Sequence, residues 1–105
     1  MSRNRSDSPT LTIISWRDIP AQVTAKKGRD TAKAELSNRF QVAIDRAAMY
    51  AGLFGTDDYL TEWRKESHDC GEDIDLEVAF EVERIEEAYT SEVLSSLWNN
   101  GGFKP

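Results

Sequence analysis

Apolar and polar side chains alternate over the first third of the chain in the way that β-strands require. Residues 11–16 are mostly β-branched or aromatic, which is strand composition. Pro20 lacks an amide donor, so we expect this strand to end or turn before it and a second strand to cover residues 21–25. Residues 26–30 supply a polar, glycine-containing hairpin loop, and residues 31–36 alternate as a third strand. The pattern predicts a small antiparallel sheet of about three strands.

After Ser37 the apolar spacing changes to a helical period. The clearest stripe runs at i, i+3, i+4, i+7, i+8 and i+11 and consists of Phe40, Ala43, Ile44, Ala47, Ala48 and Ala51. Ser37 is a suitable N-cap and Gly52 a suitable left-handed C-terminal residue. The small residues of the stripe predict that this helix approaches the sheet closely.

Three further helical segments are shorter or less regular. Thr56 and the two aspartates after it predict a short helix that reaches Lys65, and residues 67–71 are expected to be the loop that breaks it. A longer helix is expected from about Asp73 to Tyr89. Its apolar positions are Val78, Val82, Ile85 and Tyr89, with Leu76, Ala79 and Phe80 widening the face.

A last amphipathic piece covers residues 93–98 and ends at the Asn-Gly run of residues 99–102. Strands followed by three to four helices predict an α+β fold. We expect one domain over residues 11–98, a disordered tail at residues 1–10 and a flexible tail at residues 99–105.

Charge is distributed unevenly along the chain, whose net charge is −6. Residues 1–70 hold 11 Lys or Arg and 10 Asp or Glu, whereas residues 71–105 hold 2 and 9. The acidic last third should not contact phosphates, because like charges repel. It is typical of a solvated helix face and compatible with docking onto a basic protein surface.

Other bulk features exclude whole classes of protein. The chain has no apolar run long enough to span a bilayer, and its polar N-terminus lacks the apolar segment of a secretory signal. A single cysteine, Cys70, rules out an internal disulfide. We therefore expect a protein of the cytoplasm that does not contact the membrane.

One stretch crowds an aromatic, a cation, an anion and a proline into five residues. Trp16, Arg17 and Asp18 could form a contact surface for a partner, since Trp and Arg are enriched at binding hot spots. From composition alone, a strand end and a surface turn ahead of Pro20 is the favoured interpretation. Trp63 is a further candidate contact residue, because we expect the chain to have more large apolar residues than a core of this size can bury.

The predicted hairpin is basic. Lys26, Lys27 and Arg29, with Lys33 and Arg39 nearby, could bind a phosphate or a nucleic-acid backbone. Nucleic acid is disfavoured because no stacking aromatic residues are interleaved with these cations.

The remaining candidates for chemistry are weak. His68 and Cys70 are the single His and the single Cys of the chain, too few for a structural zinc site, so we expect no metal and no cofactor. They lie too near in sequence to form a nucleophile–base pair easily. The carboxylates of residues 72–87 fall on the outer face of the predicted helix, where solvation is the expected role.

Several stretches resemble a small bacterial domain family that carries the label virulence factor. The most specific stretch is residues 14–23, which includes Trp16-Arg17-Asp18-Ile19-Pro20. The others are Lys27-Gly28-Arg29, Arg39-Phe40-Gln41, residues 43–49, Gly55-Thr56-Asp57, Tyr59-Leu60 and Glu62-Trp63-Arg64. The resemblance covers roughly residues 11–65, and the acidic C-terminal region matches more weakly.

The resemblance implies an accessory or assembly role. Stand-alone alphaproteobacterial members tend to be encoded beside folate- and corrinoid-dependent one-carbon enzymes, such as methylenetetrahydrofolate reductase-like proteins and methyltransferases. In other bacteria a similar domain is fused to a scaffold-type domain of iron–sulfur assembly proteins and to helical repeats. We therefore expect a non-catalytic subunit that docks onto a larger enzyme through Trp16, Arg17, Asp18 and Trp63.

Three alternatives remain open from the sequence. The protein could complete an active site by binding a folate tail or a phosphate through Arg17 or Lys27. It could contact phosphate or nucleic acid through the basic hairpin. It could also be a redox or metal-sensing module that uses Cys70.

Overall fold

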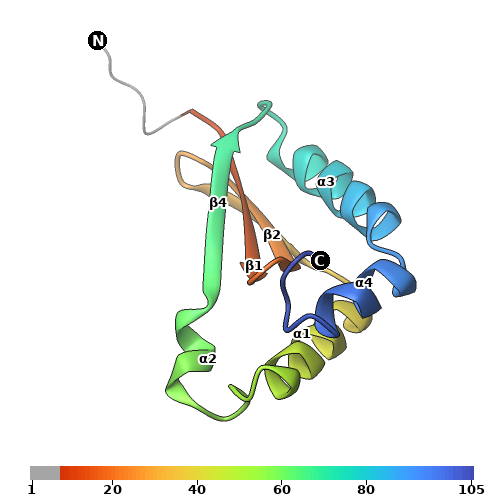
Figure 1. The fold of residues 1–105 in the computed structure, drawn as a ribbon. Coiled ribbons are helices and arrows are strands. Elements are labelled where there is room, and N and C mark those ends of the chain that lie inside the picture. The colour runs from red at the N-terminus through yellow and green to blue at the C-terminus, as the bar shows by residue number, and fades with distance from the viewer. Residues whose placement is uncertain (1–7) are drawn as a thin grey trace.

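The computed structural model describes residues 8–105 and shows a four-stranded antiparallel sheet with four helices packed around it (Figure 1). The strand order is β3-β2-β1-β4. The elements in chain order are β1 (Thr10–Trp16), β2 (Ile19–Lys27), β3 (Asp30–Glu35), α1 (Asn38–Tyr50), α2 (Asp57–Thr61), β4 (Trp63–Asp69), α3 (Ile74–Ala88) and α4 (Ser91–Trp98). The predicted α+β class is confirmed, and the sheet has one strand more than expected.

Pro20 lies inside β2, so the prediction that the second strand starts after it is wrong. The register between β1 and β2 shifts between Ile14 and Ser15, and Pro20 sits opposite Ser15 at this irregularity. A bulge is one of the places in a sheet where a missing amide donor is tolerated. The strand pair therefore continues to Trp16 and Ile19, immediately before the turn.

The fourth strand occupies a segment that we expected to be a helix end and a loop. Residues 63–69 pair with β1 in unbroken antiparallel register, from Trp16 opposite Trp63 to Thr10 opposite Asp69. The predictions that Lys65 ends a helix and that residues 67–71 form a loop are therefore wrong. β4 is a sheet edge and six of its seven residues are exposed, so it has no alternating apolar pattern by which it could be recognised.

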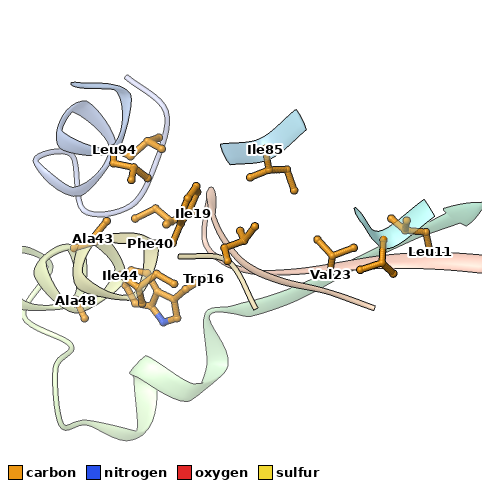
Figure 2. Close-up of a cluster of buried hydrophobic side chains, with 14 of the residues drawn as sticks. Leu11, Trp16, Ile19, Val23, Phe40, Ala43, Ile44, Ala48, Ile85 and Leu94 are labelled. Atoms are coloured by element: carbon orange, nitrogen blue, oxygen red, sulfur yellow. The ribbon is translucent and has the colours of Figure 1, made fainter. Parts of the chain in front are cut away.

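Helix α3 covers one face of the sheet and forms the first part of the core. Leu11, Val23 and Ile85 are buried there between the strands and the helix (Figure 2). The opposite face of the sheet carries polar side chains, with the Thr12 and Ser67 hydroxyls 2.7 Å apart. The sheet is therefore packed on one face along most of its length.

Helices α1 and α4 pack together at the end of the sheet where the β1–β2 turn lies, and they form the second part of the core. Trp16 and Ile19 point into this region against Phe40 and Ile44 of α1 and Leu94 of α4 (Figure 2). Three of the four alanines in the predicted α1 stripe are buried, Ala43, Ala47 and Ala48, whereas Ala51, the C-cap residue, is half-buried. Small side chains here leave room for the indole of Trp16.

The predicted residues at the two ends of α1 are confirmed in position. Gly52 follows α1 with φ +74°, the left-handed conformation expected of it. Ser37 is the N-cap residue, but its hydroxyl bonds Glu86 and not the backbone of α1. Along α3, Leu76, Ala79 and Phe80 are all exposed, so they do not widen the buried face as expected.

Parts of both expected tails belong to the folded structure. Residues 1–7 of the expected N-terminal tail lie outside the described residues, and Thr10 already belongs to β1. Residues 99–104, expected to be a flexible tail, fold back onto the β1–β2 turn, where Gly102 is buried. Within residues 8–105, no helix is both long enough and apolar enough to cross a membrane.

Candidate functional site

The turn between β1 and β2 is held by hydrogen bonds to several distant parts of the chain. Arg17 has φ +53° and is the non-glycine residue with a left-handed backbone among residues 8–105. This backbone conformation costs about 1–2 kcal/mol for any residue that has a Cβ atom. It is held by Arg17 N–H donating to Glu62 O at 3.1 Å and Asp18 N–H donating to Gly102 O at 2.8 Å.

Trp16 supports this turn from inside the core. Its side chain is 0% exposed, and its indole N–H donates to the Tyr59 carbonyl at 2.9 Å. The ring stacks on Tyr59 with centroids 5.5 Å apart, and Trp63 meets Tyr59 edge-on at 6.1 Å. Trp16 therefore cannot touch a partner, and its assignment as a contact residue is corrected to a core role.

The guanidinium of Arg17 is engaged within the chain. Its Nε donates to Glu62 Oε1 at 2.8 Å and its Nη1 donates to Gly101 O at 2.8 Å. The group lies between two rings, 5.0 Å from the Trp16 centroid and 4.5 Å from that of Phe103. With 14% of the side chain exposed, Arg17 is held by a cation–π and hydrogen-bond network that leaves little of it accessible.

Asp18 fixes the end of the chain. Its Oδ2 accepts the Lys104 backbone N–H at 2.8 Å, and its Oδ1 lies 3.6 Å from Arg64 Nη1. A Cβ added to Gly102 would lie 2.9 Å from Trp16 Cζ3, so a glycine is needed for this close approach. The turn thus joins the β1–β2 hairpin, the α2–β4 junction and the C-terminal residues.

Trp63 and Asp18 keep part of their surface at the edge of this network. Trp63 is half-buried beside Tyr59, and a quarter of the Asp18 side chain is exposed. Their role in a partner contact stays a prediction. The contacts of the turn as a whole connect three parts of the chain and stabilise the fold.

The basic hairpin does not form one cluster. Lys27 pairs with Glu72 at 2.5 Å, ahead of α3, whereas Lys26 and Lys33 lie on the polar face of the sheet. Arg29 is exposed in the hairpin turn. Arg39 is remote from the turn and bonds Glu86 and the Tyr89 carbonyl at the end of α3. The cations of this region are therefore dispersed and partly neutralised.

Cys70 and His68 lie at the end of the β4 edge. Burial raises the pKa of the Cys70 thiol, and the nearby carboxylates of Glu77, Asp69 and Glu72 raise it further. A thiol that is held protonated is a poor nucleophile at neutral pH. Among residues 8–105, no three His, Cys, Asp or Glu side chains come together in a way that could hold a metal ion.

An exposed apolar surface is the feature that sequence reasoning did not find. Met49, Tyr50, Phe54 and Leu60 are between 55% and 65% exposed and lie between the end of α1 and the end of α2. Phe54 and Leu60 line one shallow pocket, and Tyr50 meets Trp98 edge-on with ring centroids 5.5 Å apart. We call these four residues the α1–α2 patch. Leu60 lies in the short helix that the sequence predicts, but only the fold shows that its side chain is exposed whereas those of Tyr59 and Trp63 are half-buried.

The fold and the turn together define the class: a small α+β domain whose Trp-Arg-Asp turn ties the sheet to the C-terminal residues. A family model described as virulence factor matches residues 14–97, from β1 through most of α4. The chain therefore belongs to the virulence factor family. No curated protein and no solved structure matches the chain.

Proposed function

We propose that this protein is a non-catalytic accessory subunit that docks onto a larger enzyme through the α1–α2 patch. The observation that carries the proposal is the exposure of four large apolar side chains within one short segment, residues 49–60. Phe54 and Leu60 line the same shallow pocket, together with Gly55 and Tyr59. Clustered apolar surface of this kind marks interaction sites, whereas apolar residues scattered singly do not.

The surroundings of the patch indicate the chemistry of the partner. Asp57 and Asp58 are exposed at its rim, in the first turn of α2. A complementary surface would carry an apolar centre with Lys or Arg around it. The family resemblance implies a folate- or corrinoid-dependent enzyme of one-carbon metabolism as the partner to test first, and we propose the cytoplasm as the compartment.

The contacts of the cations favour docking over the two ligand-binding alternatives. Arg17 and Lys27, which would bind a folate tail or a phosphate, are both paired with carboxylates of the chain itself, Glu62 and Glu72. A ligand would have to displace Glu62 from a partly buried pair, and loss of such a partner is costly. The hairpin cations point to different faces of the sheet, which disfavours a phosphate clamp or a nucleic-acid surface.

The proposal is tested by affinity capture and quantitative mass spectrometry in cells that express the neighbouring genes. Replacing two apolar anchors by serine in the variant F54S/L60S removes about 3 kcal/mol or more of burial energy, so recovery of the partner should fall about a hundredfold.

The matched control is L76S/F80S, which removes two exposed apolar side chains from α3. We expect it to recover the same partner at the wild-type level. Equal recovery by F54S/L60S and the wild-type protein, or no partner common to the wild type and the control, would overturn the proposal.

A further inference from the structure

A second surface feature lies away from the α1–α2 patch, in a groove between β4 and α3. Figure 1 shows the two elements on either side of β1 and β2, with the C-terminus ending beside them. The groove encloses about 220 Å³. Its apolar lining residues include Ile13, Pro20 and Ile85, and Ser15 and Tyr89 line it as well.

The rim of the groove concentrates positive charge. Residues 71–105 contain only two cations, Arg84 and Lys104, and both line this groove. Arg17 and Arg64 line it as well, against two acidic residues, Asp18 and Glu66. In a chain with a net charge of −6, a cation-rich cavity is a local reversal of the overall charge.

The two exposed arginines retain unused donors. Arg64 lies 3.6 Å from Asp18, too far for a hydrogen bond, and half of its side chain is exposed. The described ion-pair partner of Arg84 is Glu81, one turn earlier on the same helix, and 63% of the Arg84 side chain is exposed. A guanidinium has five N–H donors in a planar fork, so both groups can bind a carboxylate or phosphate without breaking the core.

We propose that this groove binds a small organic anion, with a phosphate or carboxylate head between Arg64 and Arg84 and a short apolar body on Ile13 and Ile85. The cavity is smaller than the roughly 300–1,000 Å³ typical of sites for drug-sized ligands, which restricts the ligand to a small metabolite. Lys104 adds a third cation from the C-terminal residues that Asp18 holds in place. This inference does not depend on the docking role of the α1–α2 patch.

The test is a nuclear magnetic resonance titration of the ¹⁵N-labelled protein with phenyl phosphate, benzoate and neutral benzyl alcohol. The two anions separate phosphate from carboxylate preference, because the tighter one identifies the head group. We expect saturable amide shifts at Ser15, Arg64 and Arg84 with a Kd of about 1 mM for the preferred anion, and none with benzyl alcohol.

Variants separate a built site from general charge attraction. R64Q/R84Q should weaken binding about tenfold or more, because it removes two charge-assisted contacts. R84Q alone should also weaken binding, and it leaves the Asp18 contact of Arg64 in place. K26Q/K33Q makes the same charge change on the polar sheet face and should leave the Kd unaltered. Shifts that do not saturate by about 10 mM of either anion, or equal weakening by the two double variants, would overturn the proposal.

Discussion

Trp16 and Gly102 lie so close together that each constrains the other. The indole fills the space between α1 and the turn, and the backbone of Gly102 passes over its six-membered ring with φ +98°. Neither residue is exposed. The C-terminal residues are therefore part of the packing around Trp16, and their glycines serve close approach as well as ending α4.

Replacing Gly102 by alanine should be strongly destabilising. The new Cβ would lie 2.9 Å from Trp16 Cζ3 and 3.3 Å from Arg17 Cβ, in addition to the strain of a left-handed alanine. We expect a loss of about 3 kcal/mol in the free energy of unfolding, measured by urea denaturation.

The control for this substitution is Gly55→Ala. Gly55 also has a positive φ, +79°, but a Cβ there would meet nothing within 4 Å. It should therefore show only the backbone term of about 1–2 kcal/mol. Equal losses for the two variants would mean that the contact between Gly102 and Trp16 is unimportant.

At the scale of elements, the start of α1 is tied to the end of α3 by one carboxylate. Glu86 accepts hydrogen bonds from the Ser37 N–H at 2.6 Å, the Ser37 hydroxyl at 2.9 Å and Arg39 Nη2 at 2.9 Å. Arg39 also donates to the Glu86 and Tyr89 carbonyls at the end of α3. These bonds fix the start of α1, although the Ser37 side chain makes no N-cap bond to the helix backbone.

The hydrogen bonds of Glu86 predict that the free energy of unfolding depends on pH. Burial alone would raise the pKa of Glu86, but the bonds from Ser37 and Arg39 together outweigh it and hold the pKa below its ordinary value of 4.5. Because the folded-state pKa is the lower one, the stabilisation is complete above pH 4.5 and is lost as the pH falls through the folded pKa. In urea denaturation from pH 7 to pH 3, the advantage of the wild-type protein over Glu86→Gln should shrink over this acidic range. An advantage that does not change with pH would contradict the assignment.

The β4 edge offers a second test at this scale. The bonds from Arg17 N–H to Glu62 O and from Cys70 N–H to Pro9 O lie at the two ends of the β1–β4 ladder. Since hydrogen-bonded pairs alternate in an antiparallel ladder, the amide of Glu66 faces β1 and that of Lys65 faces solvent. Glu66→Pro should therefore cost about 1–3 kcal/mol more than Lys65→Pro in thermal or chemical unfolding. The reverse order would show that the register is different.

β4 is the strand that could not be predicted from the sequence. The strands β1 to β3 and the helix α1 carry apolar residues at the period of their structure, so pattern analysis finds them. β4 is charged because an edge must resist pairing with other chains, and a strand without buried residues has no period to detect. The role of the turn could not be predicted either. Trp16, Arg17 and Asp18 are neighbours in the sequence, but the role of Arg17 depends on residues from distant parts of the chain. These residues are Glu62, Gly101 and Phe103.

For the whole molecule, the two proposed surfaces have different chemistry and belong to different elements. The α1–α2 patch is apolar with an acidic rim, and the β4–α3 groove is cation-rich with apolar lining residues. The Trp16–Asp18 turn, of which Arg17 and Asp18 line the groove, holds the hairpin, β4 and the C-terminal residues together. Substitutions in the turn should therefore act on stability, and substitutions in the patch on association.

The most direct test of this division reconstitutes the protein with its captured partner and measures complex assembly and the turnover of the partner enzyme. It compares the wild type with F54S/L60S and Arg17→Ala, at a temperature where circular dichroism shows each variant folded. We predict that F54S/L60S weakens assembly about a hundredfold, whereas Arg17→Ala assembles and supports turnover within about twofold of the wild type. Undiminished assembly by F54S/L60S, or normal assembly with lost turnover for Arg17→Ala, would contradict the account.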